Sequence, residues 1–269
     1  MKRIKVENLS KSYGKVRALN NISFECSAGE FITVLGSPGA GKTTLLKSIA
    51  GLIDIDHGRV YFDDLDVTDL DPKVRNVSMA FESYALYPHL TVRENILHPL
   101  KIRGGYTESQ MQSLLEEVST MLRITPLMDR KTSQLSGGQR QRVGLARALI
   151  REKPNLLLLD EPIAHLDASL RHWLRAELKK HIKAKGITTI YATPDYLEAL
   201  AMGDRVLVLS QGHLKQMGSP DDVLYNPSSA EVAAVIGDPP ANVLEARVVS
   251  YEGKFVIDLQ GNKIRAPER

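Results

Sequence analysis

Hydrophobic residues along the chain fall into two kinds of segment, short runs of strand length and longer stretches with helical spacing. Their alternation predicts an α/β fold, with a mostly parallel sheet covered by helices. Leu156–Leu159 is apolar throughout, as a strand buried on both faces of such a sheet must be. The predicted strands are Ile4–Val6, Ile22–Cys26, Phe31–Leu35, Val77–Phe81, Leu156–Leu159, Thr189–Thr193 and Arg205–Leu209.

The segment from about residue 87 to residue 153 differs, because strand patterns vanish there and helical spacing takes over. Glu108–Leu122 and Gly138–Arg151 both have the pattern of helices, so we expect a helical subdomain inserted into the α/β core. The clearest helix runs from Ala168 to about Lys185 and stops at Gly186. Its apolar residues recur every fourth position and therefore share one face: Leu170, Leu174, Leu178 and Ile182.

A second change follows Gly218, where prolines at positions 220, 227, 239 and 240 flank a short predicted helix around Ala230–Ile236. Val243–Val249 and Lys254–Leu259 then alternate like the strands of a β-hairpin around Glu252-Gly253. We therefore predict a main domain over residues 1–237. Residues 238–269 are expected to be the incomplete beginning of a small β (OB-like) accessory domain.

Composition narrows the class of protein. The 269 residues carry a formal net charge of +3, which gives no support for nucleic-acid binding. Cys26 is the single cysteine, so we expect a core residue in a chain of the cytosol. The apolar runs are far shorter than the about 20 residues of a membrane span. The basic start Met1–Lys5 lacks the apolar run of a signal peptide, so any membrane role would require docking to another protein.

Residues 36–43 match the phosphate-loop pattern G-x-x-x-x-G-K-[ST], between a predicted strand and a predicted helix. The glycines let successive backbone N–H groups surround a phosphate. Lys42 is expected to reach the β- and γ-phosphates, and the Thr43 hydroxyl to bind Mg²⁺. The pattern predicts a P-loop NTPase core. The expected nucleotide-binding residues are Gly36, Ser37, Pro38, Gly39, Ala40, Gly41, Lys42, Thr43 and Thr44.

Two carboxylates, Asp160 and Glu161, follow the buried strand Leu156–Leu159. Ligands bind at this carboxyl edge in parallel sheets. Asp160 suits support of Mg²⁺, and Glu161 suits a general base that orients or deprotonates the attacking water.

Residues 135–139 read Leu-Ser-Gly-Gly-Gln at the start of a predicted helix. Ser136 can cap that helix, while Gly137 and Gly138 leave its N–H groups open to an anion. One nucleotide does not need two such helix ends on one chain. A dimer, in which each chain closes over the phosphate loop of the other, is the economical arrangement.

Together the phosphate loop, LSGGQ and LLLLDEP, in this order, resemble ATPases of ABC transporters over essentially the whole chain. Ser83–His89, Ala168–Arg171 and Gly218–Pro220 are similar to the branch that energises import of sugars and polyols, typified by the ATPase subunit of the maltose importer. The resemblance implies two ATPases that hold two ATP with Mg²⁺ between them. They would lie beneath two permease subunits, on the cytoplasmic face of the membrane, with a solute-binding protein outside.

The resemblance also implies roles for single residues. Ser136, Gly137, Gly138 and Gln139 would contact the ATP of the partner subunit. Tyr13 matches the aromatic residue that stacks on adenine. The segment Glu82–His89 matches the contact with the permease subunits, and Asp167 matches a loop that signals between ATPases. Simple N-capping remains an alternative for Asp167. His89 and His165 lack the spacing of metal ligands and are interpreted as structural.

Two positions depart from the family pattern. Glu82 stands where the family has a glutamine that ligates Mg²⁺ and the attacking water; a carboxylate still binds metal but, when ionised, donates no hydrogen bond. Pro194 stands where the family has a histidine that contacts the γ-phosphate, and it has neither a polar side chain nor an N–H. Thr193 or Asp195 would have to compensate.

These departures predict a site that binds ATP but hydrolyses it slowly, since one lost transition-state contact costs about 10²–10³ in rate. The resulting hypothesis is that this chain is the degenerate half of an ATPase heterodimer. Its LSGGQ sequence at residues 135–139, called the signature below, would serve the ATP site of an intact partner. A homodimer with compensated sites, a nucleotide-sensing subunit without hydrolysis, and a soluble ABC protein acting on ribosomes or DNA are alternatives. The solute is not predicted, because other subunits select it.

Overall fold

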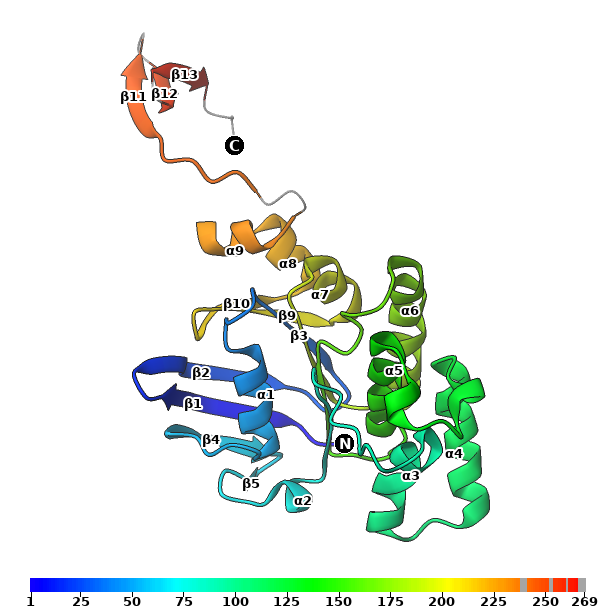
Figure 1. Cartoon of the computed structure of the whole chain (residues 1–269). Helices are drawn as coiled ribbons and strands as arrows, with labels where there is room; N and C mark the ends of the chain where they lie inside the picture. Colours follow the sequence, from blue (N-terminus) through cyan, green and yellow to red (C-terminus); the bar gives the residue numbers. More distant parts are fainter. Residues whose placement is uncertain (238–240, 252–253, 260, 266–269) are drawn as a thin grey trace.

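A six-stranded sheet forms the centre of the computed structural model, which describes residues 1–237, 241–251, 254–259 and 261–265 (Figure 1). The strand order is β10-β9-β3-β8-β7-β6, and every pair is parallel except β9 with β10. The predicted α/β fold is thereby confirmed, with β10 as an unpredicted edge strand. The strands are β3 (Phe31–Leu35), β6 (Val77–Ala80), β7 (Leu156–Asp160), β8 (Thr189–Thr193), β9 (Arg205–Ser210) and β10 (His213–Gly218).

The first two predicted strands belong to a separate antiparallel sheet, which the sequence pattern did not distinguish from the parallel one. Its order is β2-β1-β4-β5. Both strands are longer than predicted, because a bulge after Val6, with Asn8 at φ 50°, interrupts the alternation of buried and exposed residues. The strands are β1 (Ile4–Tyr13), β2 (Val16–Cys26), β4 (His57–Phe62) and β5 (Leu65–Asp66).

Alternate residues of the central strands enter two different hydrophobic layers. On β7, Leu156 and Leu158 pack with the antiparallel sheet and with helix α1 (Lys42–Ala50), whereas Leu157 and Leu159 pack against the helical layer on the other face. Because successive side chains of a strand point to opposite faces, an uninterrupted apolar run is required here. The phosphate-loop helix α1 is thus held between two sheets.

The predicted helical subdomain is confirmed. It contains α3 (Val92–Arg103), α4 (Glu108–Met121) and α5 (Gly137–Leu149), joined by the short 3₁₀ turns Thr125–Leu127 and Thr132–Gln134. The sequence did not single out α3, because Pro99 lies inside it. The predicted long helix is α6 (Ala168–Ala184). The remaining helices are α2 (Pro72–Arg75), α7 (Tyr196–Met202), α8 (Pro220–Tyr225) and α9 (Ala230–Val235).

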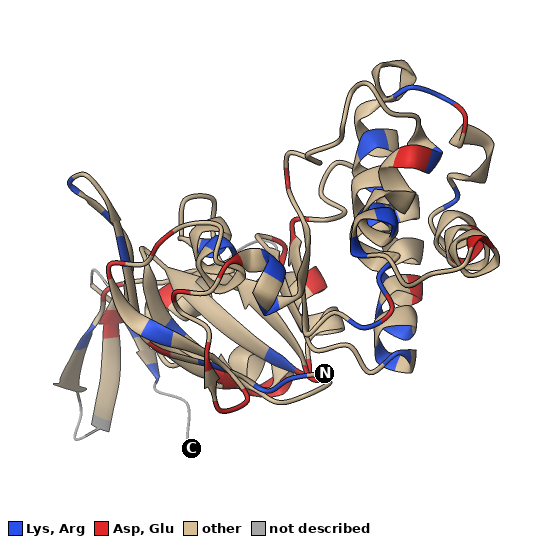
Figure 2. Cartoon of the chain, turned by 90° about the horizontal axis from the view of Figure 1, so that it is seen from below, with Lys and Arg blue, Asp and Glu red and all other residues tan. Residues whose placement is uncertain are grey.

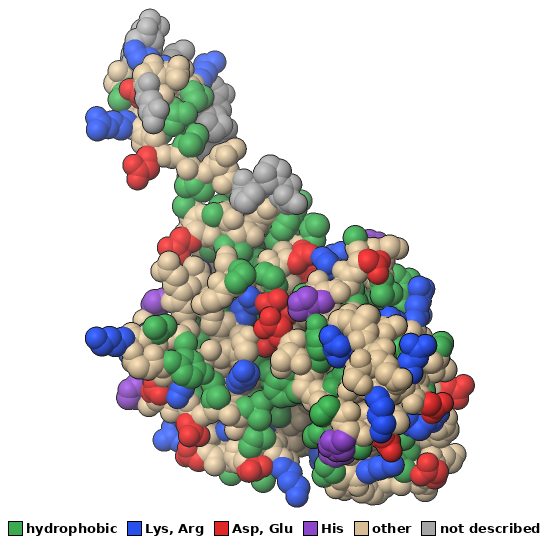
Figure 3. Space-filling view, viewed as in Figure 1, with side chains coloured by type: hydrophobic (Ala, Val, Ile, Leu, Met, Phe, Trp, Pro, Cys, Tyr) green, Lys and Arg blue, Asp and Glu red, His purple; other side chains and the backbone are tan. Residues whose placement is uncertain are grey.

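A three-stranded antiparallel sheet, in the order β11-β12-β13, follows the main body. Its strands are β11 (Arg247–Tyr251), β12 (Lys254–Leu259) and β13 (Asn262–Arg265), so the predicted hairpin is present but its first strand starts later than predicted. The predicted turn residues Glu252-Gly253 lie outside the described residues, as do residues 238–240. Apolar side chains are exposed on this sheet (Figure 3), among them Val248, Phe255 and Ile264. The division after residue 237 and the OB-like character stay predictions.

Two expectations from composition concern burial and membrane spans. Cys26 is fully buried, and this burial raises the pKa of its thiol well above the usual range, which fits the predicted core role. Within the described ranges, no helix combines the length and the apolar character that crossing a bilayer requires.

Candidate functional site

The phosphate loop connects β3 to α1, and its backbone leaves no room for larger residues at two glycines. A Cβ on Gly36 would lie 2.3 Å from the Leu209 carbonyl oxygen, and one on Gly41 would lie 2.5 Å from that of Ala18. Gly41 also has φ 106°, which only glycine adopts readily. The loop is therefore fixed in a conformation that opens the N-terminal end of α1 to an anion.

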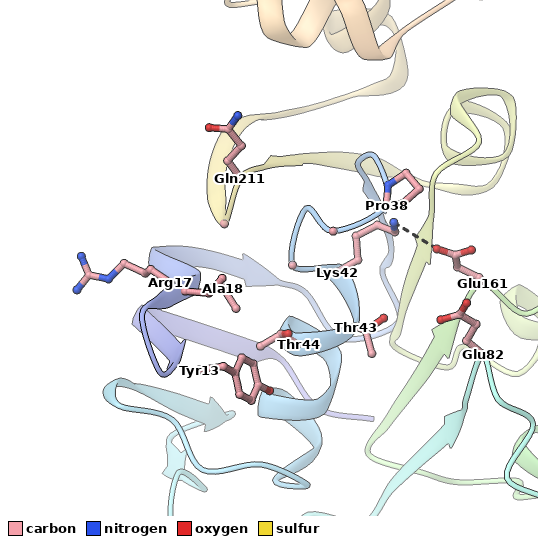
Figure 4. A pocket seen from close by; sticks show the side chains of 14 residues that line it. Tyr13, Arg17, Ala18, Pro38, Lys42, Thr43, Thr44, Glu82, Glu161 and Gln211 are labelled. Carbon is pink, nitrogen blue, oxygen red and sulfur yellow. Dashed lines mark ion pairs between the residues drawn. The ribbon is translucent and has the colours of Figure 1, made fainter.

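Lys42 lies at the first position of α1 and points back across the loop. Its Nζ donates to the carbonyl oxygens of Gly36 (2.9 Å) and Ser37 (3.3 Å), and it pairs with Glu161 Oε1 at 3.2 Å. The ammonium is buried, with 5% of the residue exposed. The structure thus brings the predicted phosphate-binding cation and the predicted general base together at one edge of the sheet (Figure 4).

The oxygen groups predicted to bind Mg²⁺ fit such an ion. Asp160 is buried, and its Oδ1 has no hydrogen-bond partner among the described residues. Burial raises the pKa of Asp160 to about 6; Glu161 and Glu82 add to the rise, while Thr43 and Lys42 oppose it. An uncompensated buried carboxylate of this kind is stabilised by a cation. Mg²⁺ commonly takes only one or two carboxylates, with phosphates and water completing its shell.

Nine of the predicted residues line a single pocket of about 530 Å³: Tyr13, Pro38, Gly39, Gly41, Lys42, Thr43, Thr44, Glu82 and Glu161. Tyr13 ends β1 and lies beside Thr44, half exposed, at the end of the pocket away from Glu161 (Figure 4). This position suits a planar base stacked on the ring while the phosphates occupy the loop. The phosphate loop and the tyrosine thus suit opposite ends of one nucleotide.

Sequence reasoning missed five further residues that line the pocket: Val16, Arg17, Ala18, Gln211 and Gly212. The turn between β9 and β10 is anchored by hydrogen bonds from Gly212 N–H to the Ala40 carbonyl (3.0 Å) and from Asn20 N–H to the Gly212 carbonyl (2.8 Å). A Cβ on Gly212 would lie 2.7 Å from the Ala18 carbonyl oxygen. The turn thereby ties the phosphate loop to β2. In the sequence, only the pair Gln211-Gly212, between two apolar runs, indicates that a turn lies here.

Pro194 follows β8 and is exposed, and it is not among the residues that line the pocket. Its two polar neighbours are engaged elsewhere. The Thr193 hydroxyl donates to Glu198 Oε2 (2.9 Å) and accepts from the Asp195 N–H (3.1 Å). The Asp195 carboxylate caps α7 by accepting from the Glu198 N–H (3.1 Å). Compensation by either residue would require breaking these bonds.

Glu198 is the centre of this buried network. Its Oε2 also accepts a hydrogen bond from the Tyr191 hydroxyl at 2.9 Å. Burial raises the pKa of Glu198, although the hydrogen bonds from Tyr191 and Thr193 favour its ionised form. The polar groups at the end of β8 are therefore turned into the protein.

The signature residues lie apart from this pocket, at the N-terminal end of α5. Ser136 and Gln139 form a reciprocal capping box: the Gln139 N–H donates to Ser136 Oγ (3.3 Å), and the Ser136 N–H donates to Gln139 Oε1 (2.9 Å). Gly137 faces open space, whereas a Cβ on Gly138 would lie 3.2 Å from Leu166. Within this chain, the structure does not bring the signature to the phosphate loop.

Gln141, one turn into α5, connects the signature helix with the general-base position. Its Nε2 donates to the Glu161 carbonyl oxygen (2.9 Å), and its Oε1 accepts from the His165 N–H (3.0 Å). Glu161 itself has a left-handed backbone, with φ 47°.

Asp167 caps helix α6, because its carboxylate accepts a hydrogen bond from the Leu170 N–H at 2.9 Å. The structure therefore shows the N-capping contact that the sequence allowed for Asp167.

The segment between β6 and α3 has an unusual backbone, with φ 63° at Tyr84 and 46° at Ala85. Arg147 of α5 donates to both of their carbonyl oxygens, at 3.2 and 2.6 Å. A Cβ on Gly144 would lie 3.1 Å from the Tyr84 carbonyl oxygen, so the segment packs directly on the helix. The Tyr84 hydroxyl also contacts His165 Nδ1 at 3.2 Å, which gives that histidine a structural contact.

Comparison with known families gives a match to the ABC transporter model over residues 19–164. The trehalose/maltose import ATP-binding protein MalK of Thermococcus litoralis is 46% identical over 93% of this chain and 68% of its own length. An sn-glycerol-3-phosphate import ATP-binding protein, UgpC 1 of Rhizobium johnstonii, is 41% identical over 98% of this chain and 70% of its own. The sulfoquinovosyl glycerol transport ATP-binding protein SmoE of Agrobacterium fabrum is 43% identical over 92% and 69%.

Among solved structures, a dimeric ATP-binding cassette in a post-hydrolysis state, bound to ADP and Pi, is similar. Its TM-score is 0.74 with 32% identity, over 81% of this chain and 98% of that one. A second dimeric structure, described as a bacterial ABC transporter cassette, gives the same values.

Proposed function

Since this chain belongs to the family of ABC transporter ATPases, we propose that it is the ATP-binding subunit that drives import of a carbohydrate, a polyol or a related phosphorylated or sulfonated solute. The relatives named for trehalose and maltose, for sn-glycerol 3-phosphate and for sulfoquinovosyl glycerol support this class of solutes. The main support for ATP binding is that Tyr13, Lys42 and Glu161 line one pocket.

The assembly proposed has two ATPase subunits beneath two permease subunits, at the cytoplasmic face of the membrane, with a solute-binding protein outside. The exposed segment Glu82–His89 is the proposed contact with the permeases. The placement of Ser136–Gln139 outside the chain's own pocket supports a dimer in which the signature meets the partner's ATP. The dimeric state of two similar cassettes is consistent with this arrangement.

In the hydrolytic step, Lys42 and the loop N–H groups would hold the β- and γ-phosphates, and Glu161 would orient the attacking water. Thr43, Asp160 and Glu82 would hold Mg²⁺, which supplies charge neutralisation on the phosphates. Pro194 offers no group to the γ-phosphate, and the bonds of Thr193 and Asp195 keep both of those residues engaged. We therefore propose that this site binds ATP and turns it over slowly.

A heterodimer is the arrangement in which such a site is useful, because the partner can retain glutamine and histidine and use this chain's signature. The test is ATP hydrolysis by the purified chain alone and with a candidate partner ATPase. Slow turnover alone and fast turnover in the pair are expected. Brisk turnover by the isolated chain, abolished by Glu161→Gln, would contradict the degenerate site.

A subunit that senses nucleotide without hydrolysing it is the second candidate, and the same two departures, Glu82 and Pro194, favour it. Transport assays in the assembled complex separate the two. A sensing subunit predicts unchanged transport with Pro194→His, whereas a weak catalytic site predicts faster transport.

A further inference from the structure

A second pocket, separate from the nucleotide pocket, opens where the helical subdomain joins the core. Its volume is about 490 Å³, and it lies between α2 and the C-terminal ends of α3 and α5. Figure 1 shows α2 and α3 next to each other at the lower edge of the molecule. The residues that line it are Pro72, Lys73, Asn76, Val77, Pro99, Ile102, Arg103 and Arg151.

Three of these residues are cations, and no acidic residue is among them (Figure 2 shows the distribution of charge over the chain). Arg103 and Arg151 both donate to one neutral acceptor, Asn76 Oδ1. In the part of the chain that the structure describes, no ion pair joins Lys73, Arg103 or Arg151 to a carboxylate. Asp71, just before α2, caps that helix by accepting from the Lys73 N–H at 2.7 Å and does not line the pocket.

The pKa of Arg151 shows that placing these two arginines close together has an electrostatic cost. Its burial, together with the neighbouring charge of Arg103, lowers the pKa of the guanidinium to about 10. Elsewhere in the described chain, Arg59 and Arg205 each pair with a carboxylate. Two guanidinium groups that converge on one amide oxygen leave a concentration of positive charge that an anion would neutralise.

We propose that this pocket binds a small phosphate-bearing molecule, with Lys73, Arg103 and Arg151 on the phosphate. Arginine forks match phosphate geometry and suit bidentate hydrogen bonds. The apolar side chains of Pro72, Pro99 and Ile102 give the rest of the ligand a surface to contact. The volume is larger than one phosphate ion needs, which favours an organic phosphate.

The segment Arg75–Asn76 connects this pocket with α1 and α5, the two helices that meet nucleotide in the proposed function. Arg75 is buried and donates to the carbonyl oxygens of Ser48 (3.1 Å) and Ile49 (2.9 Å) at the C-terminal end of α1. Asn76 accepts from Arg151, which lies two residues beyond the end of α5. The phosphate-loop helix and the signature helix are thus joined through their C-terminal ends.

A phosphate held by residues of α2, α3 and the end of α5 would therefore clamp the helical subdomain against the core. This restricts the relative movement of α1 and α5, and it does so through the ends of these helices that face away from nucleotide. The binding site itself does not depend on whether the chain's own ATP site is active.

The test is calorimetric titration of the full chain with glucose 6-phosphate, inorganic phosphate and glucose. A saturating non-hydrolysable ATP analogue with Mg²⁺ is present throughout, so that the phosphate loop is occupied. Glucose 6-phosphate should bind and glucose should not. Arg103→Gln should weaken binding at least tenfold, because this exposed arginine can be replaced without disturbing the core. Arg59→Gln, an exposed arginine outside the pocket, is the matched control and should bind normally.

Hydrogen exchange gives a second, independent measurement. With glucose 6-phosphate, amides at residues 76–77 and 149–151 should become more protected, and this should not occur in Arg103→Gln. No heat of binding in the unaltered chain, or equal affinity in Arg103→Gln, would overturn the site. Equal affinity for inorganic phosphate would still support it, since the phosphate group then accounts for binding.

Discussion

Two regions of this chain are suited to meet the phosphates of ATP, the carboxyl edge of the central sheet and the N-terminal end of α5, and they differ in completeness. At the sheet edge, Lys42, Thr43 and Glu161 are in place, but the end of β8 carries Pro194, with its polar neighbours bonded inward. At α5, the Ser136–Gln139 capping box is complete and Gly137 faces open space.

In the proposed heterodimer, the signature and the chain's own ATP site would have separate functions. The signature end serves another subunit's nucleotide in the proposed dimer, so it can stay complete while the chain's own site loses a contact.

Gly137→Asp should reduce ATP turnover of the proposed heterodimer by about 10² or more, since a carboxylate would face the phosphates of the partner's ATP. The fold should be kept, because a Cβ at this position meets nothing within 4 Å. An acidic residue in the first turn of a helix is also favourable. Gly137→Ala is the steric control and should remain far more active. Equal activity of both variants would mean that this helix end does not meet nucleotide.

Asp160→Asn should raise the free energy of unfolding of the chain without nucleotide and Mg²⁺ by about 3 kcal/mol at pH 7.5. The folded-state pKa of Asp160 is raised from 3.8 to about 6, so the folded chain binds more protons between these values. Stability of the unaltered chain therefore falls as pH rises through this window. Urea unfolding at pH 4.5 and 7.5 measures the effect.

The difference in free energy of unfolding between the variant and the unaltered chain should be about 1 kcal/mol at pH 4.5 and about 3 kcal/mol at pH 7.5. A difference that does not change with pH would show that another property of the substitution is responsible. With Mg²⁺ and ATP present, the unaltered chain should become more stable than Asp160→Asn, since the neutral amide of the variant would bind the cation poorly.

Pro194→His should increase ATP turnover of the isolated chain about tenfold. This is less than the factor of about 10²–10³ that one lost transition-state contact costs, because position 82 still carries glutamate instead of the family's glutamine. Steady-state hydrolysis measures it, with Pro194→Ala as the control for relief of the proline backbone. A comparable gain from Pro194→Ala would assign the effect to the backbone and not to an imidazole.

Glu161→Gln in this chain should change ATP turnover of the proposed heterodimer less than twofold, because in that arrangement the partner's site does most of the hydrolysis. The matching substitution in the partner should nearly abolish turnover. If Glu161→Gln in this chain stops the complex, the two sites are equal and the proposed separation fails.

The sequence predicted those parts of the fold in which a single physical requirement, such as burial on both faces or the absence of a side chain, fixes the residue types. Leu156–Leu159 had to be apolar on both faces, and Gly36 and Gly41 had to lack side chains. The length of β1 was missed because the bulge at Asn8 interrupts its alternation, and α3 was missed because of Pro99.

The candidate site divides in the same way. The motif residues Lys42, Thr43 and Glu161 could be identified, since their chemistry needs fixed residue types at fixed spacing. Gln211 and Arg17 could not, because they enter the pocket only through the pairing of distant strands. The inward bonds of Thr193 and Asp195 likewise depend on how α7 follows β8.

The backbone at Tyr84 and Ala85 sets a condition for any chimera made from this protein. The segment keeps its left-handed residues because Arg147 binds their carbonyl oxygens and Gly144 lets them approach α5. A segment transplanted from another transporter ATPase into positions 82–89 would adopt that backbone geometry only if residues 144 and 147 stayed glycine and arginine. A chimera should therefore exchange residues 82–89 together with the face of α5 that carries Gly144 and Arg147.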